Sequence, residues 1–200
     1  KLTMKLTRSN DFVPVMKGGT KYYGGHQEWL KYEDLSKFFR DRACVVTAFT
    51  NVFFYLFRKG PVDFDQYNKV QFEFYKIMRP KANGDPTAKD LLRINHVLDL
   101  NLSYRMIEGR ITKRLSLGQM IDFIGEGLAK DSPVIFINWL SRDIDVMSHH
   151  GLCITEMNEK NGKHEVVVSS WARRHKFYLE DFYRQKRTYT GLIYFEKNPR

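Results

Sequence analysis

Residues 42–57 read RACVVTAFTNVFFYLF and are apolar on every side of the helix that they would form. A helix of this kind is buried within a core, because a surface helix keeps one polar face. Asp41 is the expected N-cap, since its carboxylate can accept hydrogen bonds from the backbone N–H groups of the first turn. Cys44 then falls in that turn, where unpaired N–H groups and the helix dipole favour a negatively charged sulfur. Flanked by Arg40 and Arg42, Cys44 is a candidate nucleophile as well as a candidate core residue.

The composition indicates a single globular domain over residues 1–200, since a chain of 200 residues with 42% hydrophobic side chains can build a real core. A net charge of +10 favours acidic partners without choosing among peptides, polyanions and anionic surfaces. No apolar run approaches the roughly 18 residues that span a bilayer, and no signal peptide is visible. The first residue is not Met, so a processed or excised form is compatible with the sequence, and the compartment stays open.

Hydrophobic periodicity predicts helices mainly in the first half of the chain and strands in the second. Helices are expected at residues 65–78, 87–98, 116–130 and 178–186, and strands at 102–107, 133–139, 151–157, 165–170 and 190–195. Residues 1–30 are expected to form an extended arm with turns at the paired glycines. This layout predicts an α+β fold, in which the cysteine-bearing helix of the helical half packs on a mostly antiparallel sheet.

A cysteine nucleophile needs a base that takes its proton and later protonates the leaving group, and histidine does this near neutral pH. His149 and His150 stand together at the start of a predicted strand. Strand alternation puts His149 on the same face as Cys153, and His150 on the other face. Cys153 would lie in mid-strand with no helix N-terminus to activate it, so we expect Cys44 to work with His150 and Cys153 to be a packed thiol.

The next predicted strand ends in Ser169-Ser170-Trp171. A small polar residue followed by Trp can place a hydrogen-bond acceptor beside the imidazole, with the indole shielding that bond from water. The same pattern is also compatible with a core strand that ends at a surface Trp. Trp171 and His149 are the candidate substrate-binding residues.

The order of these features resembles the papain-like cysteine peptidases, and it is closest to the bacterial branch that contains the bacteriocin-leader peptidase domains. The resemblance spans residues 44–195. It rests on a cysteine at the start of a buried helix, a histidine at the start of a strand, and Ser-Trp at the end of the next strand. It extends to a helix (116–130) before a PVIFI strand (133–137), to HGLCIT (150–155), and to the acidic, aromatic YLEDF segment (178–182).

The resemblance implies that Cys44 is the nucleophile, that His150 is the general base, and that Ser169 orients the histidine. It implies an oxyanion site made of the Cys44 N–H and a glutamine, for which Gln27 is the candidate. Three departures stand out: glycine does not flank Cys44, serine replaces the usual Asn or Asp, and no glutamine lies about six residues before the cysteine. No cofactor and no metal are expected.

The implied function is a cysteine peptidase or amide hydrolase that acts on a peptide or protein through a thioester, with water or another amine as acyl acceptor. The alternative is a catalytically inactive papain-like domain that binds peptides or a protein partner. A nucleic-acid module is unlikely, because the basic clusters at 173–176 and 184–187 are typical of solvated faces and no nucleic-acid motif accompanies them. Metal-dependent hydrolysis lacks a ligand cluster, and the oligomeric state stays open.

Overall fold

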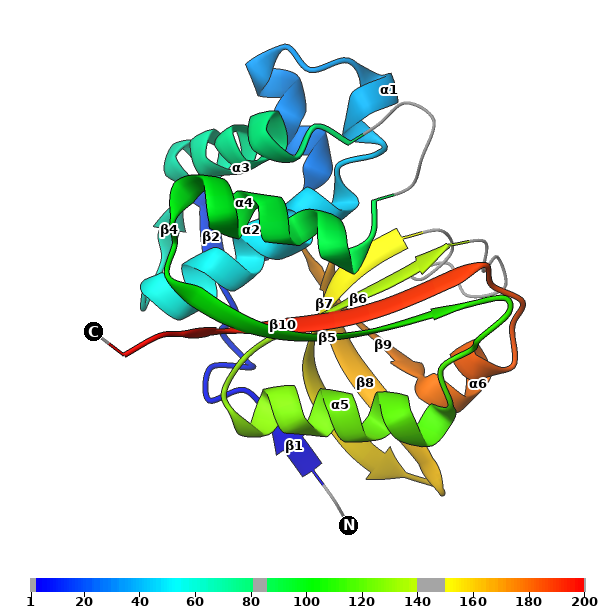
Figure 1. The fold of residues 1–200 in the computed structure, drawn as a ribbon. Coiled ribbons are helices and arrows are strands. Elements are labelled where there is room, and N and C mark those ends of the chain that lie inside the picture. Colours follow the sequence, from blue (N-terminus) through cyan, green and yellow to red (C-terminus); the bar gives the residue numbers. More distant parts are fainter. Residues whose placement is uncertain (1–2, 81–85, 140–149, 200) are drawn as a thin grey trace.

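An antiparallel sheet lies between two groups of helices in a computed structural model that describes residues 3–80, 86–139 and 150–199 (Figure 1). The helices are the 3-10 helices η1 (Gln27–Glu33) and η2 (Ala88–Leu91) and the α-helices α1 (Lys37–Arg40), α2 (Cys44–Phe57), α3 (Phe64–Met78), α4 (Leu92–Leu98), α5 (Leu117–Ala129) and α6 (Leu179–Tyr183). Helices and an antiparallel sheet together make the α+β class that the sequence predicts.

The main sheet has the strand order β5-β10-β6-β7-β8-β9, and β1 pairs with the outer part of β7. Its strands are β1 (Thr3–Lys5), β5 (Leu102–Arg110), β6 (Val134–Trp139), β7 (His150–Lys160), β8 (Lys163–Ser170), β9 (Arg173–Tyr178) and β10 (Tyr189–Lys197). Asn161 and Gly162 form the tight turn between β7 and β8, both with positive φ, as their sequence predicts.

Helix α2 forms where the apolar stretch predicts it and joins the helical layer to the sheet. Eleven of its 14 residues are buried. The ring of Phe49 packs against Phe74 of α3 at 5.3 Å and against Phe195 of β10 at 5.1 Å between ring centroids. The helix therefore packs against both the helical layer and the sheet, and this burial accounts for its apolar side chains.

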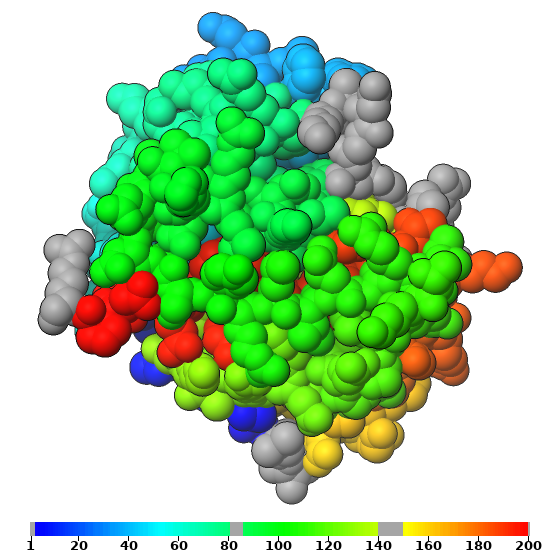
Figure 2. Space-filling model, viewed as in Figure 1, coloured from blue at the N-terminus to red at the C-terminus, as the bar shows by residue number. Residues whose placement is uncertain are grey.

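Helix α5 covers the other face of the sheet from α2 (Figure 1). Its start is fixed by a capping box, in which the Ser116 hydroxyl accepts from the Gln119 N–H and the Gln119 side chain accepts from the Ser116 N–H. Phe123 of α5 packs on Tyr194 of β10 with ring centroids 5.2 Å apart. Figure 2, viewed from the same direction as Figure 1, shows residues of α4, β5 and α5 on the side toward the viewer, where β10 is visible only in places.

The N-terminal arm is more structured than the sequence predicts. A hairpin of β2 (Pro14–Lys17) and β3 (Thr20–Tyr23) turns at Gly18-Gly19, and β2 also pairs in parallel with β4 (Val62–Asp63). Residues 27–33 then form η1 rather than extended chain. The expected extended arm over residues 1–30 is therefore corrected to a small sheet and a helical turn that pack against the helical layer.

Among the described residues, no helix combines the length and the apolar character that crossing a lipid bilayer requires.

Candidate active site

Cys44 is the first residue of α2 and is 4% exposed. The predicted N-cap, Asp41, is wrong. Asp41 instead ends α1, where its carboxylate pairs with Lys37 at 2.7 Å, and Ala43 occupies the cap position of α2. Ala43 has no side-chain oxygen, so no capping side chain accepts a hydrogen bond from the N–H groups of the first turn.

His150 is the first residue of β7 and lies beside the start of α2. The two elements touch at Val45 of α2 and Gly151 of β7. A Cβ on Gly151 would lie 2.8 Å from Val45 Cγ2 and 3.6 Å from Val45 Cα. Cys44 and His150 are each one residue from this contact, and both line the same small cavity. Glycine at 151 is what allows the helix to approach the strand so closely.

The imidazole of His150 is held by the end of β8. Its Nε2 and the Ser170 Oγ are joined by a hydrogen bond of 2.7 Å. The indole of Trp171 stacks on the imidazole with centroids 4.5 Å apart and an interplanar angle of 23°. The serine and the tryptophan that follow β8 thus fix the ring from its edge and from its face.

The expectation that Ser169 orients the histidine is wrong by one residue. Ser169 pairs with Cys153 across the sheet and donates its hydroxyl to the Tyr23 carbonyl at 2.7 Å. Neighbouring residues of a strand point to opposite faces, so Ser169 faces the N-terminal segment and Ser170 faces His150. Cys153 is fully buried and donates to the Ala48 carbonyl at 3.2 Å, as a packed thiol would.

The turn that carries Trp171 is strained and anchored. Trp171 and Ala172 have φ of 50° and 61°, a region that residues with a side chain seldom adopt. Ala172 donates its N–H to the Gly25 carbonyl, and its own carbonyl accepts from the Tyr23 N–H, both at 3.0 Å. The N-terminal segment therefore holds the turn in the conformation that places the indole over the histidine.

Gln27 begins η1 and lines the same cavity as Cys44. Its amide Nε2 donates to the Arg40 carbonyl at 3.1 Å. The chain reaches this position through Gly24, which has φ of +77°. A Cβ on Gly24 would lie 2.5 Å from Ser169 Oγ, so only glycine fits there. The route from β3 to η1 thus passes directly over the end of β8 and delivers the glutamine to the cavity.

A buried polar network fixes η1 against α2 and α3, and sequence reasoning missed it. Thr47 of α2 donates to Gln71 of α3 at 2.5 Å, and Gln71 donates to Asn68 at 3.0 Å. Asn68 in turn donates to the carbonyl of Trp29 in η1 at 2.8 Å. The sequence contains one sign of this network, since the polar residue Thr47 interrupts the apolar run of residues 42–57. Its partners could not be identified, because they lie on another helix.

The cavity is narrow, with a volume of about 10 Å³. It brings together the sequence-predicted site residues that the structure describes, namely Gln27, Cys44, His150, Ser169 and Trp171, together with Ser170. His149 lies outside the described residues. Trp171 also forms a wall of a wider recess of about 670 Å³, which His26, Trp29, Arg173 and His175 help to line.

Burial makes His150 a neutral imidazole at physiological pH. It lowers the pKa of His150 to about 3, and the nearby side chains of His26 and His175 act in the same direction. A neutral imidazole can accept a proton from a neighbouring thiol, which is the task of a general base. Burial raises the pKa of Cys153 and keeps that sulfur protonated.

The described residues contain no group of three or more His, Cys, Asp or Glu side chains that would hold a metal ion. Comparison with family models finds no match to this chain, and comparison with curated proteins finds none either.

Proposed function

We propose that this protein is a papain-like cysteine peptidase or amide hydrolase, in which Cys44 is the nucleophile, His150 the general base and Ser170 the residue that orients the imidazole. The observation that carries the proposal is the shared cavity: Cys44, at the start of a buried helix, lines the same recess as a histidine that is fixed by a serine and an indole. Cys44 lies more than 100 positions before the histidine, the serine and the tryptophan in the sequence.

Proton transfer in this mechanism begins at His150. When Nε2–H donates to Ser170, the tautomer leaves Nδ1 as the basic nitrogen that takes the proton from the Cys44 thiol. The thiolate attacks the substrate carbonyl, and the imidazolium then protonates the leaving amine. Water hydrolyses the thioester with His150 again as the base. A serine stabilises the imidazolium less than a carboxylate does, so the ion pair is less favoured than the neutral pair.

In this scheme the oxyanion would accept hydrogen bonds from the amide of Gln27 and from the backbone N–H of Cys44, the two donors that the resemblance implies. One N–H of the Gln27 amide donates to Arg40, and the second is available to the substrate. Removing one oxyanion donor typically costs about 100-fold or more in rate. Gln27 thus contributes substantially to catalysis in this scheme.

The second candidate function is an inactive papain-like domain that binds peptides. Two observations favour it. The Gln27 amide already donates a hydrogen bond to the Arg40 carbonyl, and the cavity around Cys44, with a volume of about 10 Å³, is too small for a peptide group. In this alternative the wider recess beside Trp171 would hold a peptide side chain while Cys44 stays unreactive.

Reaction with a peptidyl vinyl sulfone, followed by mass spectrometry of the labelled peptides, separates the two candidates. The wild type should be labelled at Cys44 at least about 100-fold faster than glutathione at neutral pH, since a positioned base contributes about this factor. Cys44→Ser should abolish the labelling, His150→Ala should reduce it by a similar factor, and Cys153→Ser should leave it intact. A folded wild type labelled no faster than glutathione would exclude the peptidase and leave the peptide-binding domain.

A further inference from the structure

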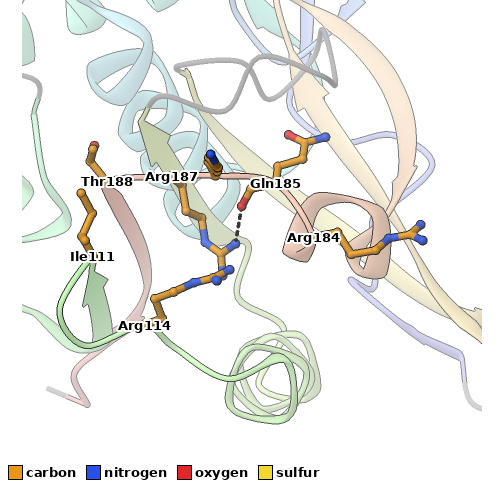
Figure 3. A pocket seen from close by; sticks show the side chains of 7 residues that line it. Ile111, Arg114, Arg184, Gln185, Arg187 and Thr188 are labelled. Carbon is orange, nitrogen blue, oxygen red and sulfur yellow. Dashed lines mark hydrogen bonds between the residues drawn. The ribbon is translucent and has the colours of Figure 1, made fainter.

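A second pocket, of about 600 Å³, lies beside the N-terminal end of β10 (Figure 3). Four of the seven described residues that line it are Arg or Lys. Arg114 comes from the loop between β5 and α5, and residues 184–188 come from the connection between α6 and β10. Among the described residues, none that lines this pocket also lines the Cys44 cavity. The pocket is therefore considered independently of the proposed hydrolase site.

Arg187 is the buried cation of this pocket. Although it ends the basic run 184–187, which is typical of a solvated face, it is only 8% exposed. One guanidinium nitrogen, Nη1, donates to the carbonyls of Tyr183 and Gln185 at 2.9 and 3.2 Å (the second is dashed in Figure 3). The other, Nη2, is buried and has no hydrogen-bond partner among the described residues. A buried guanidinium donor without an acceptor is costly unless a ligand supplies one.

The two central guanidinium groups lie over aromatic rings, Arg114 over Tyr183 and Arg187 over Phe182 and Tyr183, and no described carboxylate offsets their charge. Arg114 donates to the Tyr183 carbonyl at 3.1 Å, so two guanidinium groups meet at the same backbone oxygen. Arg184 pairs with Asp181, but within the described part of the chain no carboxylate pairs with Arg114, Lys186 or Arg187. Burial and the charge of Arg114 lower the pKa of Arg187 to about 10, which leaves it protonated at neutral pH.

We propose that this pocket binds the phosphate group of a small phosphorylated molecule, with Arg187 Nη2 and Arg114 donating to the phosphate oxygens. A phosphate offers several acceptor oxygens and about two negative charges, and so it matches two guanidinium groups better than a single carboxylate does. A volume of about 600 Å³ lies within the range of small-molecule sites. Ile111 provides an apolar wall for the rest of such a ligand.

Isothermal titration of the full chain with sodium pyrophosphate tests the proposal. The wild type should bind one equivalent, and Arg187→Gln should bind about tenfold more weakly or not at all, since a charged donor is lost from a buried site. Arg114→Gln changes an exposed residue and tests the same pocket if Arg187→Gln fails to fold. Arg93→Gln is the matched control, because Arg93 is exposed and lies on α4, outside the pocket.

Three results would overturn the proposal: no binding of pyrophosphate to the wild type, equal loss of binding in Arg93→Gln, or glutarate binding as tightly as pyrophosphate. Sedimentation with vesicles that contain phosphatidic acid identifies the source of the phosphate. If the protein sediments with the vesicles and Arg187→Gln does not, the phosphate belongs to a lipid headgroup. If the protein binds pyrophosphate but does not sediment, the ligand is a soluble phosphorylated molecule. Either outcome supports the proposed phosphate site.

Discussion

The surroundings of His150 lower the pKa of its imidazole. The stacked indole of Trp171 and the strand on which the ring sits exclude water from the imidazole, and Ser170 offers it a hydroxyl rather than a negative charge. Burial disfavours the protonated ring, and the Ser170 hydroxyl does not offset this as a carboxylate would. The residue is therefore suited to take up a proton only briefly, during a reaction, and not to store one at rest.

This tuning predicts a pH-dependent stability. The pKa of His150 is lowered from 6.5 to about 3 in the folded chain, so between these values the unfolded chain binds a proton that the folded chain does not. The free energy of unfolding should therefore fall as pH is lowered through this window, by at most about 1.4 kcal/mol per pH unit from this residue. Urea unfolding at several pH values should give a shallower dependence for His150→Gln. Parallel curves for the two proteins would contradict the assignment.

At the residue scale, the sequence predicts that Cys44 and His150 lie together, because each stands at the start of its element, and both residues line one cavity. Ser170 could not be chosen over Ser169, because the choice depends on which face of β8 meets the histidine. The positive φ of Trp171 is equally hidden, since neither Trp nor Ala signals a turn of that kind.

At the scale of elements, the contact between α2 and β7 sets the separation of the candidate nucleophile and base. Gly151→Ala would place a methyl group 2.8 Å from Val45 Cγ2 and push the helix away from the strand. We expect a loss of about 1–3 kcal/mol in the free energy of unfolding, together with slower labelling of Cys44. Urea unfolding and the vinyl sulfone assay measure the two effects.

Two variants make this prediction specific. Val45→Ala in the Gly151→Ala background removes the clashing methyl groups and should recover part of both losses. Gly118→Ala is the control, because a Cβ there would have its nearest neighbour at 4.0 Å and would lie within α5. If Gly151→Ala behaves like Gly118→Ala, the close approach of helix and strand does not constrain the site.

Elements with a strong local pattern were predictable, and those defined by distant partners were not. The capping box of Ser116 and Gln119 fixes the start of α5 within the chain itself. The hairpin of β2 and β3 has no alternating apolar pattern, and it gains its order from pairing with β4 and from packing on α3. Asp41 is expected to cap α2, but it ends the short helix α1 directly before it.

At the scale of the whole molecule, Asn51 joins three parts of the chain. Its Oδ1 accepts from the Gly25 N–H at 2.9 Å and from the Tyr67 hydroxyl at 2.6 Å, and so it connects the N-terminal segment, α2 and α3. Asn51→Ala would leave the buried Gly25 N–H without its acceptor and the Tyr67 hydroxyl with only the longer bond to the Thr47 carbonyl at 3.4 Å, and it should lower the free energy of unfolding by about 2–4 kcal/mol. Tyr67→Phe removes only one of these bonds and should cost about half as much. Equal stability of Asn51→Ala and the wild type in urea would show that the polar connection is not needed.

The bond between the Ser169 hydroxyl and the Tyr23 carbonyl joins residues 146 positions apart. During synthesis at about 5–20 residues per second, the ribosome needs roughly 7 to 30 s to make the intervening chain. Cys44 is made early in that interval, whereas His150 is made near its end and Ser170 and Trp171 directly after it. The thiol is thus separated in time from the base that would activate it, and a nascent chain carries Cys44 without its candidate partners until the ribosome has passed residue 171.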